Sequence, residues 1–377
     1  MAIQIKPRAL SAFRRTPPEP SSNSAKSLPQ EYFVSPKIFT EEQKRIFAKE
    51  WLLVGHQSQI SKAGDYFLAT VSEESIIVIR DSKLAIRAFF NVCRHRGTRL
   101  KEDSCGHSAT IQCPYHAWTY GLDGQLVGAP HMAEVPGFDK ADYSLNPVNL
   151  GIWEGFIFVN LEQNPRPLEE WFAPLNGKFS HWNLSLLRSA KRIEYDVRAN
   201  WKLMFENYSE CYHCPGVHPQ LQKVSPYDSA ENDLHEGPFL GGFMKINAGK
   251  SLTVTGNACA SFVGKIENLQ QVFYYSIFPN MLLSLHPEYA MVHQLWPQSP
   301  DRTLIYCDWL FHPEAFPRKE FNPGDAIDFW DLTNKQDWHM CELSQKGISS
   351  RAYEPGPYSS RESIPAAWDR EYLRHLS

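Results

Sequence analysis

Two Cys-His pairs in the first half of the chain have the residue types and spacing to bind a metal. One residue lies between Cys93 and His95, two lie between Cys113 and His116, and 17 residues separate the pairs. Each pair lies at a turn between predicted strands, so two facing loops can bring two thiolates and two imidazoles to one site. A zinc site uses the same ligands, but usually groups Cys with Cys and His with His. The mixed pairs favour a two-iron cluster with one iron on two cysteines and the other on two histidines.

A second possible metal site lies much later in the chain, around His213 and His218. We predict a helix from Trp201 to about Cys211 and a break at Pro215-Gly216, so that His213 near the helix end and His218 beyond it can turn toward one point. Two histidines and one carboxylate with open coordination positions form the facial triad of non-haem Fe(II) oxygenases. The alternative is that both histidines are ordinary core or surface residues.

The elements that must position the first pairs are short strands separated by turns. A helix is predicted over 40–51 because Thr40-Glu-Glu-Gln43 resembles a capping box. A compact all-β domain is expected over 41–160, after an N-terminal arm at 1–40 that is rich in Ser and Pro. Its strands are expected at Leu52–Val54, Tyr66–Val71, Ile76–Arg80, Leu84–Asn91, Ala109–Gln112 and Gly155–Asn160.

The composition changes after Asn160, and a second domain of sheet and helices, an α+β architecture, is expected over 161–377. Helices are predicted at 323–346 and 364–375 in addition to the one that begins at Trp201. Strands are predicted at 192–198, 242–246, 272–278, 281–286, 290–296 and 303–311.

Charge and composition exclude several classes of function for this chain of 377 residues. The net charge is −4, which argues against a nucleic-acid partner. No apolar run approaches the roughly 18 residues that a membrane helix requires, and residues 1–30 contain no secretory signal. We therefore expect a cytoplasmic protein without membrane contact. Its eight cysteines should be reduced, with no structural disulfide.

The first pairs resemble a known motif. Cys93-Arg-His95-Arg-Gly97 with Cys113-Pro-Tyr-His116-Ala-Trp118 is similar to the Rieske [2Fe–2S] motif of ring-hydroxylating oxygenase α subunits. Respiratory Rieske proteins carry an additional cysteine in each loop, where this chain has Thr98 and Tyr115. The resemblance implies that Cys93, His95, Cys113 and His116 are the cluster ligands, and that the cluster is of the oxygenase type.

The segment from Asn200 to His218 resembles the iron-binding segment of the same α subunits. This implies that His213 and His218 bind a mononuclear Fe(II), and that Glu210 links this iron to the Rieske centre of a neighbouring subunit. Asn207 and Tyr208 should border the active-site pocket, with Asn207 a catalytic candidate beside Glu210. The third iron ligand should be Asp337, in the context Asp337-Trp-His-Met-Cys341-Glu-Leu-Ser-Gln345; Asp331 and Asp328 are the alternatives.

The resemblance also implies a fold, an assembly and an activity. The fold is an all-β Rieske domain followed by an α+β helix-grip (START-like) catalytic domain, in a head-to-tail homotrimer. Electrons come from NAD(P)H through a separate reductase or ferredoxin, since this chain has no Gly-x-Gly-x-x-Gly fingerprint. The expected activity is O2-dependent hydroxylation or N-dealkylation of a small molecule. Glu210 within Glu-Cys-Tyr-His-Cys-Pro favours the choline, carnitine and glycine-betaine monooxygenase branch and thus a quaternary amine. A cis-dihydroxylating dioxygenase, and a zinc or electron-transfer protein without catalysis, are the alternatives.

Overall fold

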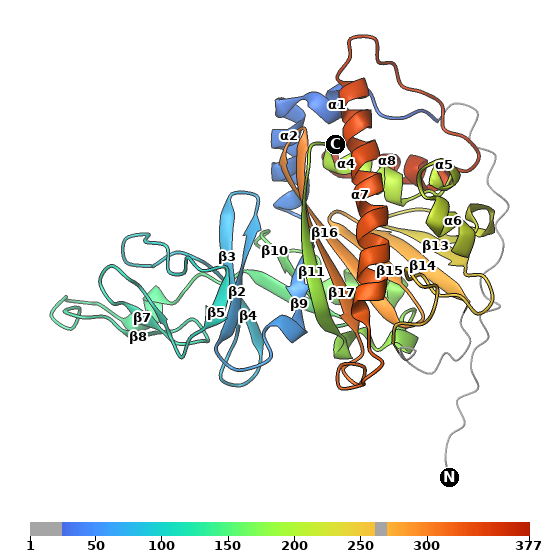
Figure 1. The fold of residues 1–377 in the computed structure, drawn as a ribbon. Helices are drawn as coiled ribbons and strands as arrows, with labels where there is room; N and C mark the ends of the chain where they lie inside the picture. The colour runs from blue at the N-terminus through green and yellow to red at the C-terminus, as the bar shows by residue number, and fades with distance from the viewer. Residues whose placement is uncertain (1–24, 261–269) are drawn as a thin grey trace. The chain divides into compact units, whose positions relative to one another are not determined.

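The chain forms two compact units in the computed structural model, which describes residues 25–260 and 270–377 (Figure 1). One unit is Thr40–Ser189, and the other combines residues 25–39 with the described part of Ala190–Ser377. Residues 1–24, which make up most of the predicted N-terminal arm, lie outside the described part. No helix in the described ranges is long and apolar enough to cross a membrane.

The unit Thr40–Ser189 is built from antiparallel sheets, as the predicted all-β domain requires. Its largest sheet has the order β4 (Ile86–Phe90), β3 (Glu74–Arg80), β2 (Asp65–Val71), β5 (Cys105–His107). The other two are β1 (Leu52–His56), β10 (Phe156–Asn160), β9 (Asn149–Trp153) and β6 (Ile111–Gln112), β7 (Thr119–Tyr120), β8 (Leu126–Gly128). The hydrophobic core of this unit includes Cys93 and Cys113, so the cysteines of both pairs point inward.

The other unit contains a seven-stranded antiparallel sheet, which the predicted α+β architecture requires. Its central strands are almost fully buried, and most of their residues are apolar. The strand order is β11 (Arg188–Val197), β17 (Arg302–Phe311), β16 (Tyr289–Ser299), β15 (Met281–Leu285), β14 (Gln271–Ile277), β13 (Phe239–Lys245), β12 (Glu231–Leu234).

The long helix α7 (Pro323–Ile348) lies against this sheet (Figure 1). Its buried residues recur every three or four positions, which gives the helix one apolar face. Polar contacts also hold it to the sheet: Trp330 Nε1 donates to the Tyr289 hydroxyl at 2.7 Å, and the Tyr195 hydroxyl donates to Asp331 at 2.9 Å. The helix α4 (Trp201–Tyr208) contacts α7 and β16, and α8 (Ser363–Leu376) contacts α4 and β13.

The helix predicted over 40–51 begins earlier in the structure than expected. Helix α2 begins at Pro36 and runs to Glu42, and a π-helical turn follows at Gln43–Phe47. Proline is well suited to the first position of a helix, where its missing N–H has no partner to lose. Thr40 therefore lies inside α2 and does not cap it.

Candidate metal sites and active-site cavity

Cys93 and Cys113 begin two loops that have the same backbone hydrogen bonds. In each loop the cysteine N–H donates to the carbonyl five residues later, and the cysteine carbonyl accepts from the N–H four residues later. That fourth residue, Gly97 in one loop and Ala117 in the other, has a positive φ, 76° and 56° respectively. The two loops are therefore local copies of each other, and each presents a cysteine followed by a histidine.

The four side chains divide into an inner and an outer half. Cys93 and Cys113 are each 3% exposed, whereas His95 is exposed and His116 is partly exposed. The imidazole rings of His95 and His116 meet edge to face with 4.8 Å between centroids, and the Trp118 ring stacks on His95 at 4.7 Å. Two buried thiols opposite two outer imidazoles fit a [2Fe–2S] group held by cysteines on one iron and histidines on the other.

Tyr120 is a partner of this site that the sequence did not reveal. Its side chain is fully buried, and its hydroxyl lies 3.3 Å from Cys93 Sγ. The hydroxyl oxygen accepts a hydrogen bond from the Arg94 N–H at 3.0 Å, so the hydroxyl proton is free to point at the sulfur. Burial and the adjacent Cys93 sulfur raise the pKa of Tyr120, which keeps the hydroxyl a neutral donor.

We expect Tyr120→Phe to lower the reduction potential of the Rieske cluster while the cluster stays bound. A hydrogen bond to a cluster sulfur stabilises the more negative, reduced state. A hydrogen bond worth about 1 kcal/mol corresponds to about 40 mV for one electron. Redox titration followed by EPR measures the shift. Tyr115→Phe is the control, because Tyr115 is 58% exposed and contacts His116 with its ring. An unchanged potential in Tyr120→Phe would contradict the assigned hydrogen bond.

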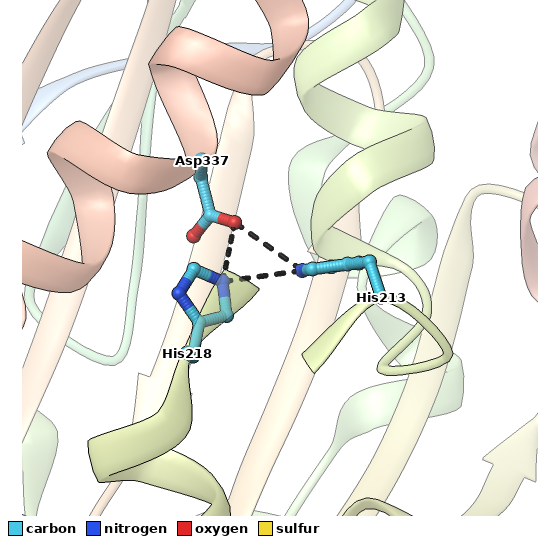
Figure 2. A group of neighbouring side chains, drawn as sticks. All are labelled: His213, His218 and Asp337. Atoms are coloured by element: carbon cyan, nitrogen blue, oxygen red, sulfur yellow. Dashed lines mark hydrogen bonds and ion pairs between the residues drawn. The ribbon is translucent and has the colours of Figure 1, made fainter. Parts of the chain in front are cut away.

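One group of possible metal ligands joins His213 and His218 to Asp337, which lies on a helix far away in the sequence (Figure 2). His218 Nε2 is 2.7 Å from Asp337 Oδ1 and 3.2 Å from His213 Nε2, and His213 Nε2 is 3.3 Å from Asp337 Oδ1. Adjacent ligands of an octahedral divalent ion with bonds of about 2.1 Å lie about 3 Å apart. The three atoms thus have the spacing of ligands on one face of a metal ion, with the other face left open.

Each imidazole donates its Nδ1 proton to the oxygen of a neighbouring side chain. His213 Nδ1 donates to Glu210 Oε1 at 2.5 Å, and His218 Nδ1 donates to Gln336 Oε1 at 2.8 Å. A proton on each Nδ1 leaves each Nε2 with its lone pair toward the shared point, as metal binding requires. Gln336 was not predicted; the only sequence signal for it is that it directly precedes Asp337.

The charges around this point favour a cation. Burial lowers the pKa of His213, but the hydrogen bonds with Asp337 and Glu210 more than compensate and raise it to about 10. Burial raises the pKa of Asp337, and the two histidines outweigh this and lower it. The site therefore stabilises positive charge among its three ligands, and a divalent metal ion bound there would supply that charge.

The chain around the two histidines differs from the prediction. Helix α4 ends at Tyr208, three residues earlier than expected, and Glu210 lies in the turn that follows it. Pro215-Gly216 does not break a helix but lies within the short helix α5 (Cys214–Val217). His213 and His218 are the residues that directly precede α5 and α6 (Pro219–Val224). Proline at the first or second position suits both helices, which explains the error.

The expectation that the protein has no disulfide is wrong. Cys211 and Cys214 form a disulfide on either side of Tyr212 and His213. The turn brings their Cα atoms to 5.1 Å, within the range that a disulfide needs. The prediction rested on the expected compartment alone. It took no account of the turn that brings the two cysteines into contact.

The alternative third ligands lie elsewhere. Asp331 accepts hydrogen bonds from the Tyr195 hydroxyl at 2.9 Å and from Lys335 at 2.6 Å. Asp328 is exposed on α7. Neither belongs to the group of possible ligands that contains Asp337.

A cavity surrounds the open side of the His213, His218 and Asp337 group, with about 860 Å³ of empty space that includes its opening to solvent. Asn207, Tyr208 and Glu210, all of them predicted near the active site, line this cavity. Aromatic and apolar side chains make up much of the rest, including Phe243, Tyr274, Met291, Trp330 and Trp338. A cavity of this size and lining accepts a small organic molecule beside the metal.

Comparisons with known proteins give the same two parts. Residues 50–139 match the family model of the Rieske [2Fe–2S] domain, and residues 184–377 match that of the ring hydroxylating alpha subunit (catalytic domain). A glycine betaine monooxygenase oxygenase subunit from Chromohalobacter salexigens is 33% identical over 371 residues, covering 88% of this chain and 82% of the relative.

Two solved structures are similar over nearly the whole chain. One is a quaternary ammonium Rieske monooxygenase described for carnitine oxidation and inter-subunit electron transfer: TM-score 0.82, 25% identity, covering 97% of this chain and 100% of the other. The other is naphthalene 1,2-dioxygenase from Rhodococcus sp., with TM-score 0.76 and 21% identity, covering 93% and 94% of the two chains. The second likeness shows the shared fold alone. Together they confirm the predicted pairing of a Rieske domain with a helix-grip catalytic domain.

Proposed function

This chain belongs to the α subunits of ring-hydroxylating Rieske oxygenases, and from that premise we propose which residues perform the reaction and what they act on. It is an oxidoreductase with a Rieske [2Fe–2S] cluster and a mononuclear iron. As in its relatives, the oxygenase subunit receives electrons from a separate reductase. We propose that these come from NAD(P)H, directly or through a ferredoxin, and that the protein works in the cytoplasm, where NAD(P)H is available.

We assign the cluster to Cys93, His95, Cys113 and His116, in a domain over residues 41–160. The matched loops and the inner and outer pairs support this assignment. We assign the iron to His213, His218 and Asp337, in a domain over residues 161–377. The triangle of 2.7 to 3.3 Å between their ligand atoms is the observation that carries the proposal, because it leaves one face open for O2 and substrate.

Glu210 is proposed to carry the electron path into the catalytic iron site. Its Oε1 holds His213 Nδ1, and its other oxygen accepts from the His213 N–H at 3.2 Å. About 12% of its side chain is still exposed, so one lone pair can accept a hydrogen bond from a histidine ligand of another subunit. A head-to-tail homotrimer provides that neighbour, and inter-subunit electron transfer is described for the structurally similar quaternary ammonium monooxygenase.

The residues of the site orient and shield the reaction. When bound, the iron activates O2 with two electrons and two protons, so that one oxygen atom enters the substrate and the other leaves as water. Glu210 and Gln336 fix the orientation of the two imidazoles by holding their Nδ1 protons. The apolar walls of the cavity limit water around the open coordination face. Asn207 lines the cavity and offers an amide to a bound substrate.

A small quaternary amine is the proposed substrate, to be hydroxylated or N-dealkylated. The named relatives act on glycine betaine and carnitine. In this chain Tyr208, Tyr274, Trp330 and Trp338 all line the cavity, and aromatic faces attract an ammonium group. The acidic Glu210 and Asp337 add negative charge to the same cavity.

A single-turnover experiment tests this proposal without the natural reductase. The iron-loaded protein is reduced with dithionite, the excess is removed, and ¹⁸O2 is added with choline, glycine betaine, carnitine or naphthalene. We expect one labelled oxygen in the product of an ammonium compound, or an aldehyde from its demethylation. A naphthalene cis-diol with two labelled oxygens would replace the monooxygenase by the dioxygenase alternative. Colourless protein that contains zinc would favour the non-catalytic alternative.

A further inference from the structure

His293 is a buried polar residue in the cavity wall that metal binding leaves unused. It lies on β16 and is 1% exposed. The Asn334 side chain lies close enough to influence its ring, but neither ring nitrogen makes a well-formed hydrogen bond among the described residues. Its ring meets the rings of Tyr208 and Trp338 edge to face, at 6.3 and 5.9 Å between centroids. A buried polar group without a well-formed hydrogen bond is costly, so it marks a place where a ligand can supply one.

The imidazole of His293 is a neutral group. Burial lowers its pKa to about 4, although Asn334 and Asp337 oppose this effect. A neutral imidazole has one N–H donor and one acceptor nitrogen, but no charge. It can therefore exchange hydrogen bonds with a hydroxyl, and it cannot neutralise a carboxylate.

Tyr274 adds a buried hydroxyl on the same sheet face. It lies on β14 opposite Ser284, which in turn lies opposite Met291, two residues before His293 on β16. Alternate residues of a strand share a face, so Tyr274 and His293 both face the cavity that they line. The Tyr274 hydroxyl is buried and has no hydrogen-bond partner in the described part of the chain.

The charges of the cavity wall decide whether a carboxylate or a hydroxyl of the substrate binds here. Among the described residues that line the cavity, none is Lys or Arg, and the charged side chains are Glu210 and Asp337. Apart from the bound iron, the described lining offers a substrate carboxylate no counter-charge, and the carboxylate would lose its water in the same cavity as two acidic groups. A hydroxyl loses far less, because the neutral donors of the wall replace its water.

We propose that His293 determines specificity by binding an uncharged hydroxyl of the substrate, so that this enzyme prefers an amino alcohol with a quaternary ammonium group to a quaternary amino acid. The inference rests on the proposed quaternary-amine function and specifies its substrate class. Tyr274 is a further donor to the same oxygen. The inference distinguishes this chain from relatives named for glycine betaine and carnitine, both of which carry a carboxylate.

Binding of three ammonium compounds to the wild-type protein is the first test. Isothermal titration of the iron-loaded, dithionite-reduced protein under argon requires neither turnover nor reductase. Choline carries the hydroxyl, ethyltrimethylammonium lacks it, and glycine betaine has a carboxylate in its place. We expect choline to bind about tenfold more tightly than ethyltrimethylammonium, as the loss of one buried hydrogen bond predicts. Glycine betaine should bind more weakly than choline by at least the same factor.

Variants then locate the contact. His293→Phe should abolish the advantage of choline over ethyltrimethylammonium and leave the binding of ethyltrimethylammonium within about twofold. His286→Phe is the matched control, since His286 is a fully buried histidine that does not line the cavity. Iron content and the Rieske spectrum are measured on both. Should a variant lose its iron, His293→Asn, which restores a neutral donor and acceptor, takes its place and should retain part of the advantage of choline.

The outcomes separate this inference from the proposed function. If glycine betaine binds as tightly as choline or more tightly, or if His293→Phe retains the preference for the hydroxyl, the inference is wrong while the quaternary-amine function stands. If none of the three compounds binds, the quaternary-amine function itself is wrong.

Discussion

Replacing Asp337 with alanine is expected to remove the mononuclear iron and to leave the Rieske cluster in place. Asp337 Oδ1 is the only charged ligand atom of the group, at 2.7 and 3.3 Å from the two imidazole nitrogens. Two neutral imidazoles alone hold Fe(II) weakly. Iron should fall from about three to about two atoms per chain, and substrate oxidation should be lost. Metal analysis and the visible spectrum of the cluster, on the same sample, measure both effects.

Asp331→Ala is the matched control for this change. Asp331 lies on the same helix, α7, but its carboxylate binds the Tyr195 hydroxyl and Lys335 instead of the metal group. The variant should lose about 1 kcal/mol of stability and should keep its full iron content. The assignment of the third ligand is wrong if Asp331→Ala loses iron and Asp337→Ala retains it.

Glu210→Gln is expected to keep both metal centres and to lose turnover that depends on the cluster. The glutamine has the shape of glutamate, but its amide cannot hold the Nδ1 protons of two histidine ligands as a carboxylate does. Loss of such an outer partner reduces activity by about 10- to 100-fold. Stopped-flow absorbance of the reduced cluster, mixed with O2 and substrate, should show reoxidation slowed by that factor while iron content stays unchanged.

Glu206→Gln tests whether this effect is specific to Glu210. Glu206 lies on α4, four residues before Glu210, and does not line the cavity. Burial and the nearby Asp369 raise its pKa well above the ordinary value, which favours the neutral carboxyl that glutamine resembles closely. Reoxidation should then proceed at the wild-type rate. Equal slowing in both variants would mean that any change in α4 or in the segment that follows it disturbs the iron, and the bridging role of Glu210 would lose its support.

The ligand loops of the first domain could be predicted because their geometry is local. Cysteine and histidine within four residues of each other must lie on the same loop, and positive φ at Gly97 or Ala117 is part of that loop alone. The neighbouring strands were predicted only in part. β4 begins at Ile86 instead of Leu84 and β6 at Ile111 instead of Ala109, and β5 and β7 were not predicted. Leu84 has a φ of 65°, which does not fit a strand and could not be known from its residue type.

The partners of the metal ligands could not be predicted because long-range packing brings them together. Gln336 reaches His218 across 118 positions of sequence only because α7 docks on the sheet beside α5 and α6. Tyr120 is similar: it follows the second loop but binds the cysteine of the first. Asp337 was identified from a resemblance in its neighbours, since spacing alone left Asp328 and Asp331 equally possible.

The metal content of the purified wild-type protein tests the central claim most directly. We expect about three iron atoms and two acid-labile sulfides per chain, with a Rieske EPR signal that appears when dithionite is added. The Rieske signal and the sulfide should disappear in Cys93→Ser, and the third iron should disappear in Asp337→Ala. A colourless protein that binds zinc at both sites, with no sulfide and no EPR signal on reduction, would contradict the account.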